Sequence, residues 1–175
     1  LQLSPPTTWD EFLDTARILK DAGHTPIANG LREDEESDMF MTLTPNFIGG
    51  REGRESYMNG ERCFNDAYAV RAFHSMQEIM PYMSRDFTTV SSISSKQRFI
   101  NENAAMLFGG SWDLRYFSEN VGFDWGVFAS PAPLGSQTSV IFQPDIGIGV
   151  NNQVSAAHQK AALRFLAWLM TEEGL

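Results

Sequence analysis

The stretch Asn103-Ala104-Ala105-Met106-Leu107-Phe108-Gly109-Gly110-Ser111-Trp112-Asp113 decides how this chain is interpreted. Its five small or apolar residues from Ala104 to Phe108 have strand length and end at glycines, which predicts a short strand. Ser111 is a predicted N-cap, with Trp112 and Asp113 as the first residues of a helix. An indole and a carboxylate then leave a strand end together, beside exposed backbone N–H groups. That combination is typical of a small-molecule site.

Length and charge bound the class of protein. The chain has 175 residues, enough for one domain with a real core, and its formal net charge is −9. Because nucleic acids and anionic membranes are bound through clustered Lys and Arg, we expect no nucleic-acid partner. The single cysteine, Cys63, forms no CxxC or Cys/His cluster, so we expect neither a zinc site nor a cofactor. The acidic run from Glu33 to Asp38 lacks the alternating ligands and sharp-turn glycine of a calcium loop, which predicts a solvated loop.

The ends of the chain also carry information. The sequence has no run of about 18 apolar residues, the length that a membrane-spanning helix needs. It opens Leu1-Gln2-Leu3-Ser4 without an initiator Met, which suggests a segment of a longer protein.

The first third of the chain predicts alternating helices and strands. Thr8 and Glu11 form a capping box that opens a helix, and Gly23 ends that helix as a left-handed cap. Residues 24–28 predict a short strand. A helix start is expected at residues 39–43, broken by the segment Pro45-Asn46-Phe47-Ile48-Gly49-Gly50.

The remainder predicts a polar, turn-rich stretch at residues 51–65 and then further helices and strands. One helix ends near Pro81, and its expected apolar stripe is Ala69, Val70, Phe73, Met76 and Met80. Strands are expected at 123–128 and 146–150. The last helix begins near Ser155 and is expected to bury Ala161, Leu163, Phe165, Leu166, Trp168 and Leu169. No repeat or long linker divides the chain, so we expect one compact α/β unit in which helices dominate.

Catalytic motifs fail one after another. Gly147-Ile148-Gly149 lacks the third glycine and the lysine of a phosphate loop. Gly109 to Asp113 lacks the final glycine of a serine-hydrolase elbow. The three histidines have no metal-type spacing, and no carboxylate pair stands out among the 22 acidic residues.

Sugar binding asks for different residues. A flat aromatic stacks on the C–H face of a pyranose while carboxylates bind its hydroxyls, and Trp112 with Asp113 supplies both. Asp145, just before a glycine-rich strand, is a second candidate carboxylate. Two alternatives stay open: Trp112 as a core residue, and Asp145 as an ordinary turn aspartate.

Several segments, in this order, resemble the family 1 extracellular solute-binding proteins of bacterial sugar ABC importers. The segments are Pro6-Thr7-Thr8-Trp9-Asp10-Glu11-Phe12, Ala22 to Ala28, Phe99 to Asp113, Trp125 to Phe128, Pro131-Ala132-Pro133, Gly147 to Asn151 and Ala161 to Leu169. The resemblance implies one lobe of a periplasmic-binding-protein-like (type II) fold, in which two lobes close like a hinge on a solute. Residues 1–175 look like a C-terminal-lobe segment, without the N-terminal lobe and the final helices.

The resemblance also implies a set of contact residues. Trp112 falls where the family's Gly-Ser-Trp places a stacking aromatic, and Asp113 adjoins it. Asp145 and Gly147 fall in the loop that often lines the cleft. Many relatives have a tryptophan in the segment that matches residues 37–40, where Phe40 is the aromatic available here.

The leading hypothesis is therefore a non-enzymatic receptor component that binds a mono- or oligosaccharide and delivers it to the membrane subunits of an ABC permease. Such a protein is expected to be monomeric and exported, as a periplasmic protein or a cell-surface lipoprotein. One rival hypothesis is a carbohydrate-active hydrolase with two unrecognised carboxylates. Another is an interaction domain in which Trp112 is buried.

Overall fold

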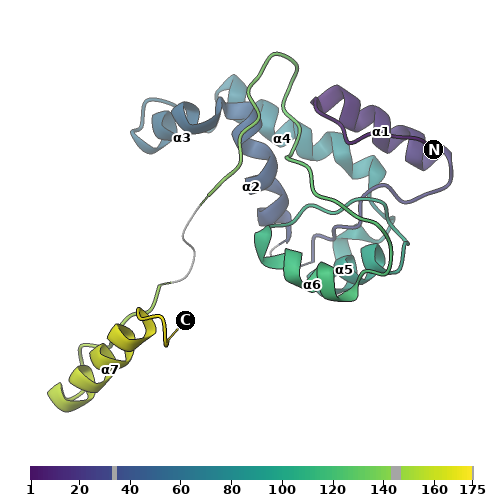
Figure 1. Cartoon of the computed structure of the whole chain (residues 1–175). Helices are drawn as coiled ribbons and strands as arrows, with labels where there is room; N and C mark the ends of the chain where they lie inside the picture. The colour runs from purple at the N-terminus through teal and green to yellow at the C-terminus, as the bar shows by residue number, and fades with distance from the viewer. Residues whose placement is uncertain (33–34, 143–146, 175) are drawn as a thin grey trace. The chain divides into compact units, whose positions relative to one another are not determined.

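The computed structural model describes residues 1–32, 35–142 and 147–174, and it divides into two compact units, 1–141 and 142–175. The first unit carries the helices α1 (Trp9–Asp21), α2 (Glu35–Ile48), α3 (Gly50–Met58), α4 (Ala67–Ile79), α5 (Ser92–Ile100) and α6 (Leu114–Asn120), with 3₁₀ turns η1 (Met80–Tyr82), η2 (Phe87–Thr89) and η3 (Ser111–Asp113). The second carries α7 (Ala156–Leu169) (Figure 1). The prediction that residues 1–175 form a single lobe stays a prediction.

Helix α1 begins and ends as its local signals predict. The Thr8 hydroxyl accepts a hydrogen bond from the Glu11 backbone N–H, and the Glu11 carboxylate accepts one from the Thr8 backbone N–H, completing the capping box. Gly23 follows the helix at φ 87°, a left-handed conformation that favours glycine. The buried face of the helix carries Trp9, Phe12, Ala16 and Leu19.

Three short parallel segments form the centre of the first unit. Ile27 makes parallel bridges to Met83 on one side and to Met106 on the other. The Ala28 N–H donates to the Met106 carbonyl at 2.8 Å. The predicted segments 24–28 and 104–108 therefore do pair, but within the described residues the β pairing consists of single bridges. Residues 123–128 were predicted as a strand, but none of the β bridges among the described residues involves them.

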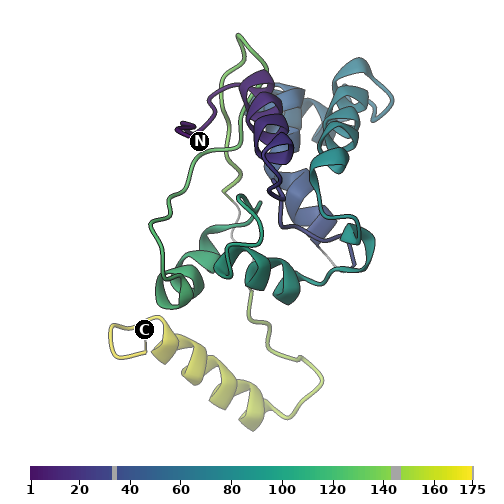
Figure 2. The ribbon, with the colours of Figure 1, turned by 90° about the vertical axis from the view of Figure 1, so that its right-hand side faces the viewer.

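The main core lies where α1, α2 and α4 meet these segments, and α2 packs along α4 (Figure 2). Its buried members are Trp9, Phe12, Ile27, Met39, Leu43, Phe47, Ile48, Ala72, Ile79 and Met83. The Trp9 indole N–H donates to the Glu78 carboxylate at 2.7 Å, so this buried tryptophan also satisfies its polar atom.

A second, smaller aromatic cluster holds α5 beside α6. Phe99 of α5 meets Phe117 of α6 edge to face at 5.3 Å between ring centroids, and Phe117 meets Trp125 at 5.8 Å. Phe123 packs on Phe99 at 5.6 Å. These rings position the extended segment 123–128, which explains why it lies close to the body without joining a ladder.

Two local predictions were wrong between residues 35 and 65. Helix α2 begins at Glu35, inside the run predicted as a loop, and continues through Pro45 to Ile48. Proline removes one helical hydrogen bond, but the buried Phe47 and Ile48 hold the last turn against the core. The stretch predicted as turn-rich contains α3, which begins after Gly49 at φ 91°.

The apolar stripe of α4 was predicted in part correctly. Ala69 is buried and Met76 packs against the core, but Val70, Phe73 and Met80 are exposed. The buried face also carries Ala72, Ser75 and Ile79. Ala72 and Ser75 are small members of this buried face, and Phe73, although exposed, still stacks on Phe40 of α2.

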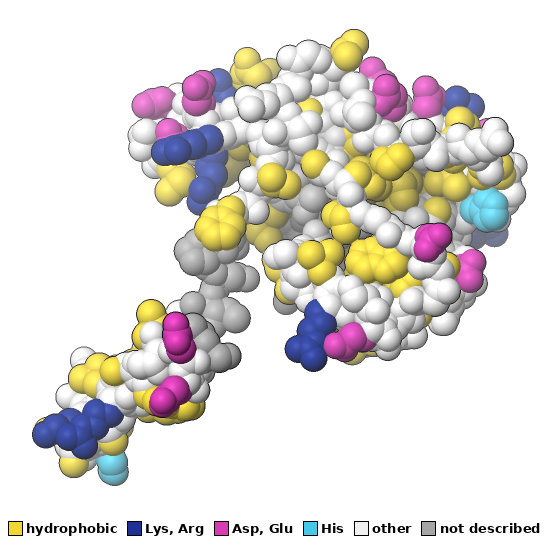
Figure 3. Space-filling view, viewed as in Figure 1, with side chains coloured by type: hydrophobic (Ala, Val, Ile, Leu, Met, Phe, Trp, Pro, Cys, Tyr) yellow, Lys and Arg dark blue, Asp and Glu magenta, His cyan; other side chains and the backbone are white. Residues whose placement is uncertain are grey.

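The second unit is described by itself. Ser155 caps α7 as predicted, accepting a hydrogen bond from the His158 N–H at 3.3 Å. Leu163, Phe165 and Trp168, which were predicted to be buried, are exposed in this unit taken by itself, because within its described part no other helix covers α7. Hydrophobic side chains are accordingly visible on its surface (Figure 3). Their burial in the whole protein stays a prediction. Among the helices of the described residues, none has the length and hydropathy that crossing a bilayer requires.

Candidate functional site

The turn from Gly109 to Asp113 leads from the central parallel segments into α6. Gly110 is extended, at φ −121° and ψ 176°, and residues 111–113 form the single 3₁₀ turn η3. The Asp113 N–H donates to the Gly110 carbonyl at 3.0 Å. Ser111 is therefore inside the turn, and its prediction as an N-cap was wrong: Gly110 holds that position, without a side-chain cap. A strand end followed at once by a tight turn is nevertheless the predicted local arrangement.

Trp112 presents an open aromatic face. Its side chain is 61% exposed, so in this unit the alternative that Trp112 is a core residue is wrong. One face of the indole lies directly over the Gly110 backbone: a Cβ at Gly110 would fall 2.3–2.4 Å from the ring atoms Cη2, Cζ2 and Cζ3. Only glycine leaves room for this contact. The ring is thus supported from one side and free on the other, which is the geometry that stacking on a flat apolar face requires.

Asp113 is held under the same turn. It is 6% exposed, and its Oδ1 lies 2.6 Å from the Nζ of Lys96 on α5. Its Oδ2 lies close to Gly109: a Cβ added at Gly109 would be 2.9 Å from this oxygen, closer than side-chain atoms normally approach. The consecutive glycines therefore have separate roles: Gly109 makes room for the carboxylate and Gly110 for the indole. Asp113 as a solute ligand stays a prediction, since its recorded contact is with Lys96.

A buried asparagine holds the segment that leads into the turn. Asn29 is 1% exposed, its Oδ1 accepts from the Phe108 N–H at 2.7 Å, and its Nδ2 donates to the Phe108 carbonyl at 2.8 Å. The Asn29 side-chain amide therefore binds the backbone of Phe108 as a neighbouring strand would, and Phe108 is the residue directly before Gly109. Neither Asn29 nor Lys96 was predicted to belong to the site. An asparagine directly after the predicted strand 24–28 was the available signal for Asn29, whereas Lys96 had none.

The other predicted contact residues are Phe40 in the first unit and Asp145 and Gly147 beyond it. Phe40 stacks on Phe73 of α4, with ring centroids 4.8 Å apart, and is packed partly against the core. Gly147 is exposed and belongs to the second unit. Asp145 lies outside the described residues. Phe40, Gly147 and Asp145 as solute contacts therefore stay predictions.

The position of Trp112 relative to the parallel segments is informative. Ligands of open α/β sheets bind beyond the carboxyl ends of the strands, and the turn 109–113 follows such an end. A groove of about 470 Å³ lies at the opposite ends of the same segments, and its lining includes Gly23, His24 and Glu102. Among the described residues no group of three or more His, Cys, Asp or Glu side chains is placed to hold a metal ion. The turn with Trp112 is the better candidate site.

Comparisons with known proteins bear on the family and the fold. The model of a family described as bacterial extracellular solute-binding protein matches residues 1–175. A curated relative is 26% identical over 169 residues, which is 95% of this chain and 36% of the relative. It is an uncharacterized ABC transporter extracellular-binding protein of Pyrococcus horikoshii.

Solved structures show the same fold. A chitin oligosaccharide binding protein has a TM-score of 0.76 at 21% identity, covering 98% of this chain and 44% of its own. A solute-binding protein in complex with raffinose has a TM-score of 0.71 at 19% identity, covering 98% of this chain and 46% of its own. The chain therefore spans less than half the length of these proteins. The predicted fold class, a helix-rich part of a periplasmic-binding-protein-like lobe, is confirmed.

Proposed function

This chain belongs to the bacterial extracellular solute-binding proteins, and on that premise we propose that it binds a carbohydrate for an ABC importer. The observation that carries the proposal is the Trp112 indole, supported on one face by Gly110 and 61% exposed. A pyranose offers a flat C–H face that such a ring covers, while its hydroxyls need polar partners at the rim. The solved relatives named above bind chitin oligosaccharides and raffinose, which favours a carbohydrate over an amino acid or an ion.

The mechanism we propose is hinge closure. The turn 109–113 supplies one wall of a cleft. The other wall comes from the part of the receptor that corresponds to the regions of the relatives outside the match. A solute that contacts both walls binds the closed form more tightly than the open form, and so shifts the population toward closure. The closed form is then the one that the membrane permease recognises. We place the chain in the C-terminal lobe of such a receptor.

The remaining properties follow from this function. The receptor acts outside the cytoplasmic membrane, either in the periplasm or as a lipoprotein, and works as a monomer. It delivers its solute unchanged, so we expect no turnover of any sugar. Binding at a single stacked ring also accommodates different pyranoses, with selectivity set by the polar groups around it.

Calorimetric titration of the full-length protein with an oligosaccharide panel that includes raffinose and chitobiose tests the proposal. Replacing Trp112 with Ala should weaken binding of the preferred sugar at least about tenfold, or about 1.4 kcal/mol, because a stacking residue acts as a binding hot spot. Phe64→Ala is the matched control, since Phe64 is another aromatic of the same unit and is 73% exposed. Equal affinities of the Trp112 variant and the parent would contradict the proposal, as would hydrolysis of any sugar in the panel.

A further inference from the structure

An ion pair connects the turn that carries Trp112 to a separate helix. Lys96 of α5 and Asp113 of η3 lie 2.6 Å apart, Nζ to Oδ1. We infer that Lys96 is a positioning residue, which sets the orientation of the Trp112 indole through Asp113. The inference rests on the proposed function for its consequence in sugar binding, and on the geometry alone for its effect on the indole.

The pair is unusual for its burial. The side chains of Asp113 and Lys96 are 8% and 23% exposed, whereas every other ion pair recorded for the described residues has a partner at least 39% exposed. Exposed pairs such as Arg115–Glu119 add little, because water screens them. A buried carboxylate that loses its partner is left as an uncompensated charge in a site that water barely reaches. Asp113 therefore depends on Lys96 in a way that the exposed carboxylates do not depend on theirs.

The link from Asp113 to Trp112 is short and stiff. Trp112 is the middle residue of the one-turn helix η3, and the Asp113 N–H closes that turn on the Gly110 carbonyl at 3.0 Å. The Asp113 side chain fixes the same turn from below, with Oδ2 against Gly109 and Oδ1 on Lys96. If the carboxylate moved out toward water, the turn would have to rotate, and the indole would lose its support on Gly110.

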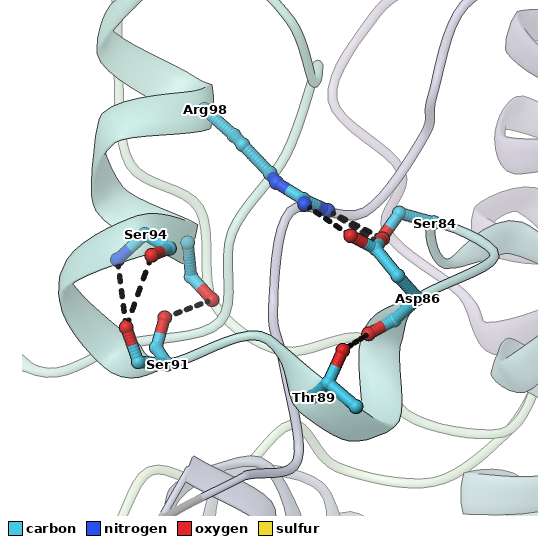
Figure 4. A network of polar contacts seen from close by, with 7 residues as sticks. Ser84, Asp86, Thr89, Ser91, Ser94 and Arg98 are labelled. Atoms are coloured by element: carbon cyan, nitrogen blue, oxygen red, sulfur yellow. Dashed lines mark hydrogen bonds and ion pairs between the residues drawn. The ribbon is translucent and has the colours of Figure 1, made fainter.

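Lys96 is itself on a helix that is firmly attached. Ser91 caps α5 by accepting a hydrogen bond from the Ser94 N–H, and Arg98 makes two hydrogen bonds to the Asp86 carboxylate, at 2.8 and 3.1 Å (Figure 4). Arg98 also donates to the Ser84 hydroxyl, next to Met83. Met83 in turn bridges Ile27, the central segment that also pairs with Met106. Both ends of the Lys96–Asp113 pair are therefore attached to one frame.

The first test reads the indole directly and needs no sugar. In the full-length protein, the indole N–H resonance of Trp112 is identified by its loss in Trp112→Phe. Lys96→Met should shift or broaden this resonance and leave that of the buried Trp9 in place, while Lys96→Arg should preserve both. Gln97→Ala is the matched control, because it removes the neighbouring hydrogen bond from α5 to Tyr116 of α6, 2.7 Å long and exposed. An unchanged Trp112 resonance in Lys96→Met would overturn the inference.

The second test asks whether Lys96 acts through Asp113. Affinity for the preferred sugar is compared among Lys96→Met, Asp113→Asn and the double variant, which also removes the uncompensated charge and so remains able to fold. We expect Lys96→Met to lose at least about fivefold in sugar affinity. The double variant should lose no more affinity than the single variant that binds the sugar less tightly. Losses that multiply would overturn the inference, because Lys96 would then touch the solute itself.

The two tests separate this inference from the proposed function. A protein that binds no sugar but whose Trp112 resonance responds to Lys96→Met supports the positioning role and contradicts the function. A protein that binds sugar through Trp112 but whose Trp112 indole N–H resonance is unchanged in Lys96→Met supports the function and overturns the positioning role.

Discussion

Replacing Gly110 with Ala should misplace the Trp112 indole while leaving the fold intact. The Gly110 backbone is at φ −121° and ψ 176°, a conformation that alanine adopts freely. The new methyl group would lie 2.3–2.4 Å from three indole carbons, against an ordinary contact of 3.4–4 Å. The ring must therefore retreat by about 1 Å or swing to another rotamer. Trp112 is exposed, so water accepts the displaced ring and the core is not disturbed.

The expected consequence separates binding from stability. A stacked sugar keeps its contact only near the optimal separation, so a ring displaced by about 1 Å should lose about tenfold in affinity, or about 1.4 kcal/mol. The free energy of unfolding should change by less than about 1 kcal/mol, because the entropic gain of a Gly→Ala change offsets part of the clash. Calorimetric titration and urea denaturation of the full-length protein measure the two quantities.

Gly126→Ala provides the matched control. A Cβ at Gly126 meets nothing within 4 Å, so this substitution should leave affinity unchanged and alter the free energy of unfolding only by the entropic gain of a Gly→Ala change, at most about 1 kcal/mol. Unchanged sugar affinity in Gly110→Ala would refute the reasoning, because it would mean that the supported position of the indole is not the one that binds. A large loss of stability would refute it too, by showing that the displaced ring has nowhere to go.

Three further predictions concern the frame of the site. Asn29→Ala leaves the partly buried N–H and carbonyl of Phe108 without their partner, and should cost about 2–3 kcal/mol of unfolding free energy in urea denaturation. A loss below about 1 kcal/mol would contradict this role. Hydrogen bonds from Arg98 hold the pKa of Asp86 well below its ordinary value near 4. The Arg98–Asp86 pair therefore stabilises the fold fully above about pH 4, the ordinary pKa of an aspartate, and loses its effect as the pH falls below it. The difference in unfolding free energy between the parent and Arg98→Met should accordingly shrink below about pH 4. A difference that stays constant with pH would count against this role of the pair. The 175-residue chain alone, offering one wall of the cleft, should bind sugar weakly or undetectably in calorimetry, and micromolar affinity would rule out the half-cleft model.

Local signals in the sequence predicted part of the fold well. The capping box of Thr8 and Glu11 and the left-handed Gly23 define α1 because each acts within a few residues. Pro45 was wrongly predicted to break α2, because the outcome there depends on tertiary contacts. Burial of the residues after Pro45 outweighs the one helical hydrogen bond that proline removes. The stripe of α4 was misplaced because the buried face includes Ala72 and Ser75, small residues that carry little weight in a hydrophobic pattern.

The site divides in the same way. Trp112 and Asp113 were predicted as contact residues from a strand, a glycine break and a helix that follow one another within a dozen residues, and their contact with a solute stays a prediction. The separate roles of Gly109 and Gly110 depend on side chains that fold back over them, which a motif alone does not show. Asn29 reaches Phe108 across 79 positions of the chain, and Lys96 reaches Asp113 from another helix, so both contacts exist only in the folded molecule.

The most direct test of the central claim is an intermolecular NOE experiment between the Trp112 indole protons and the ring protons of the preferred sugar, in the full-length protein. A stacked complex predicts NOEs from the open face of the indole to the pyranose C–H protons, with those protons shifted upfield by the ring current. Bound sugar whose C–H protons show no NOE to Trp112, and keep their chemical shifts when Trp112 is replaced by Ala, would contradict the account.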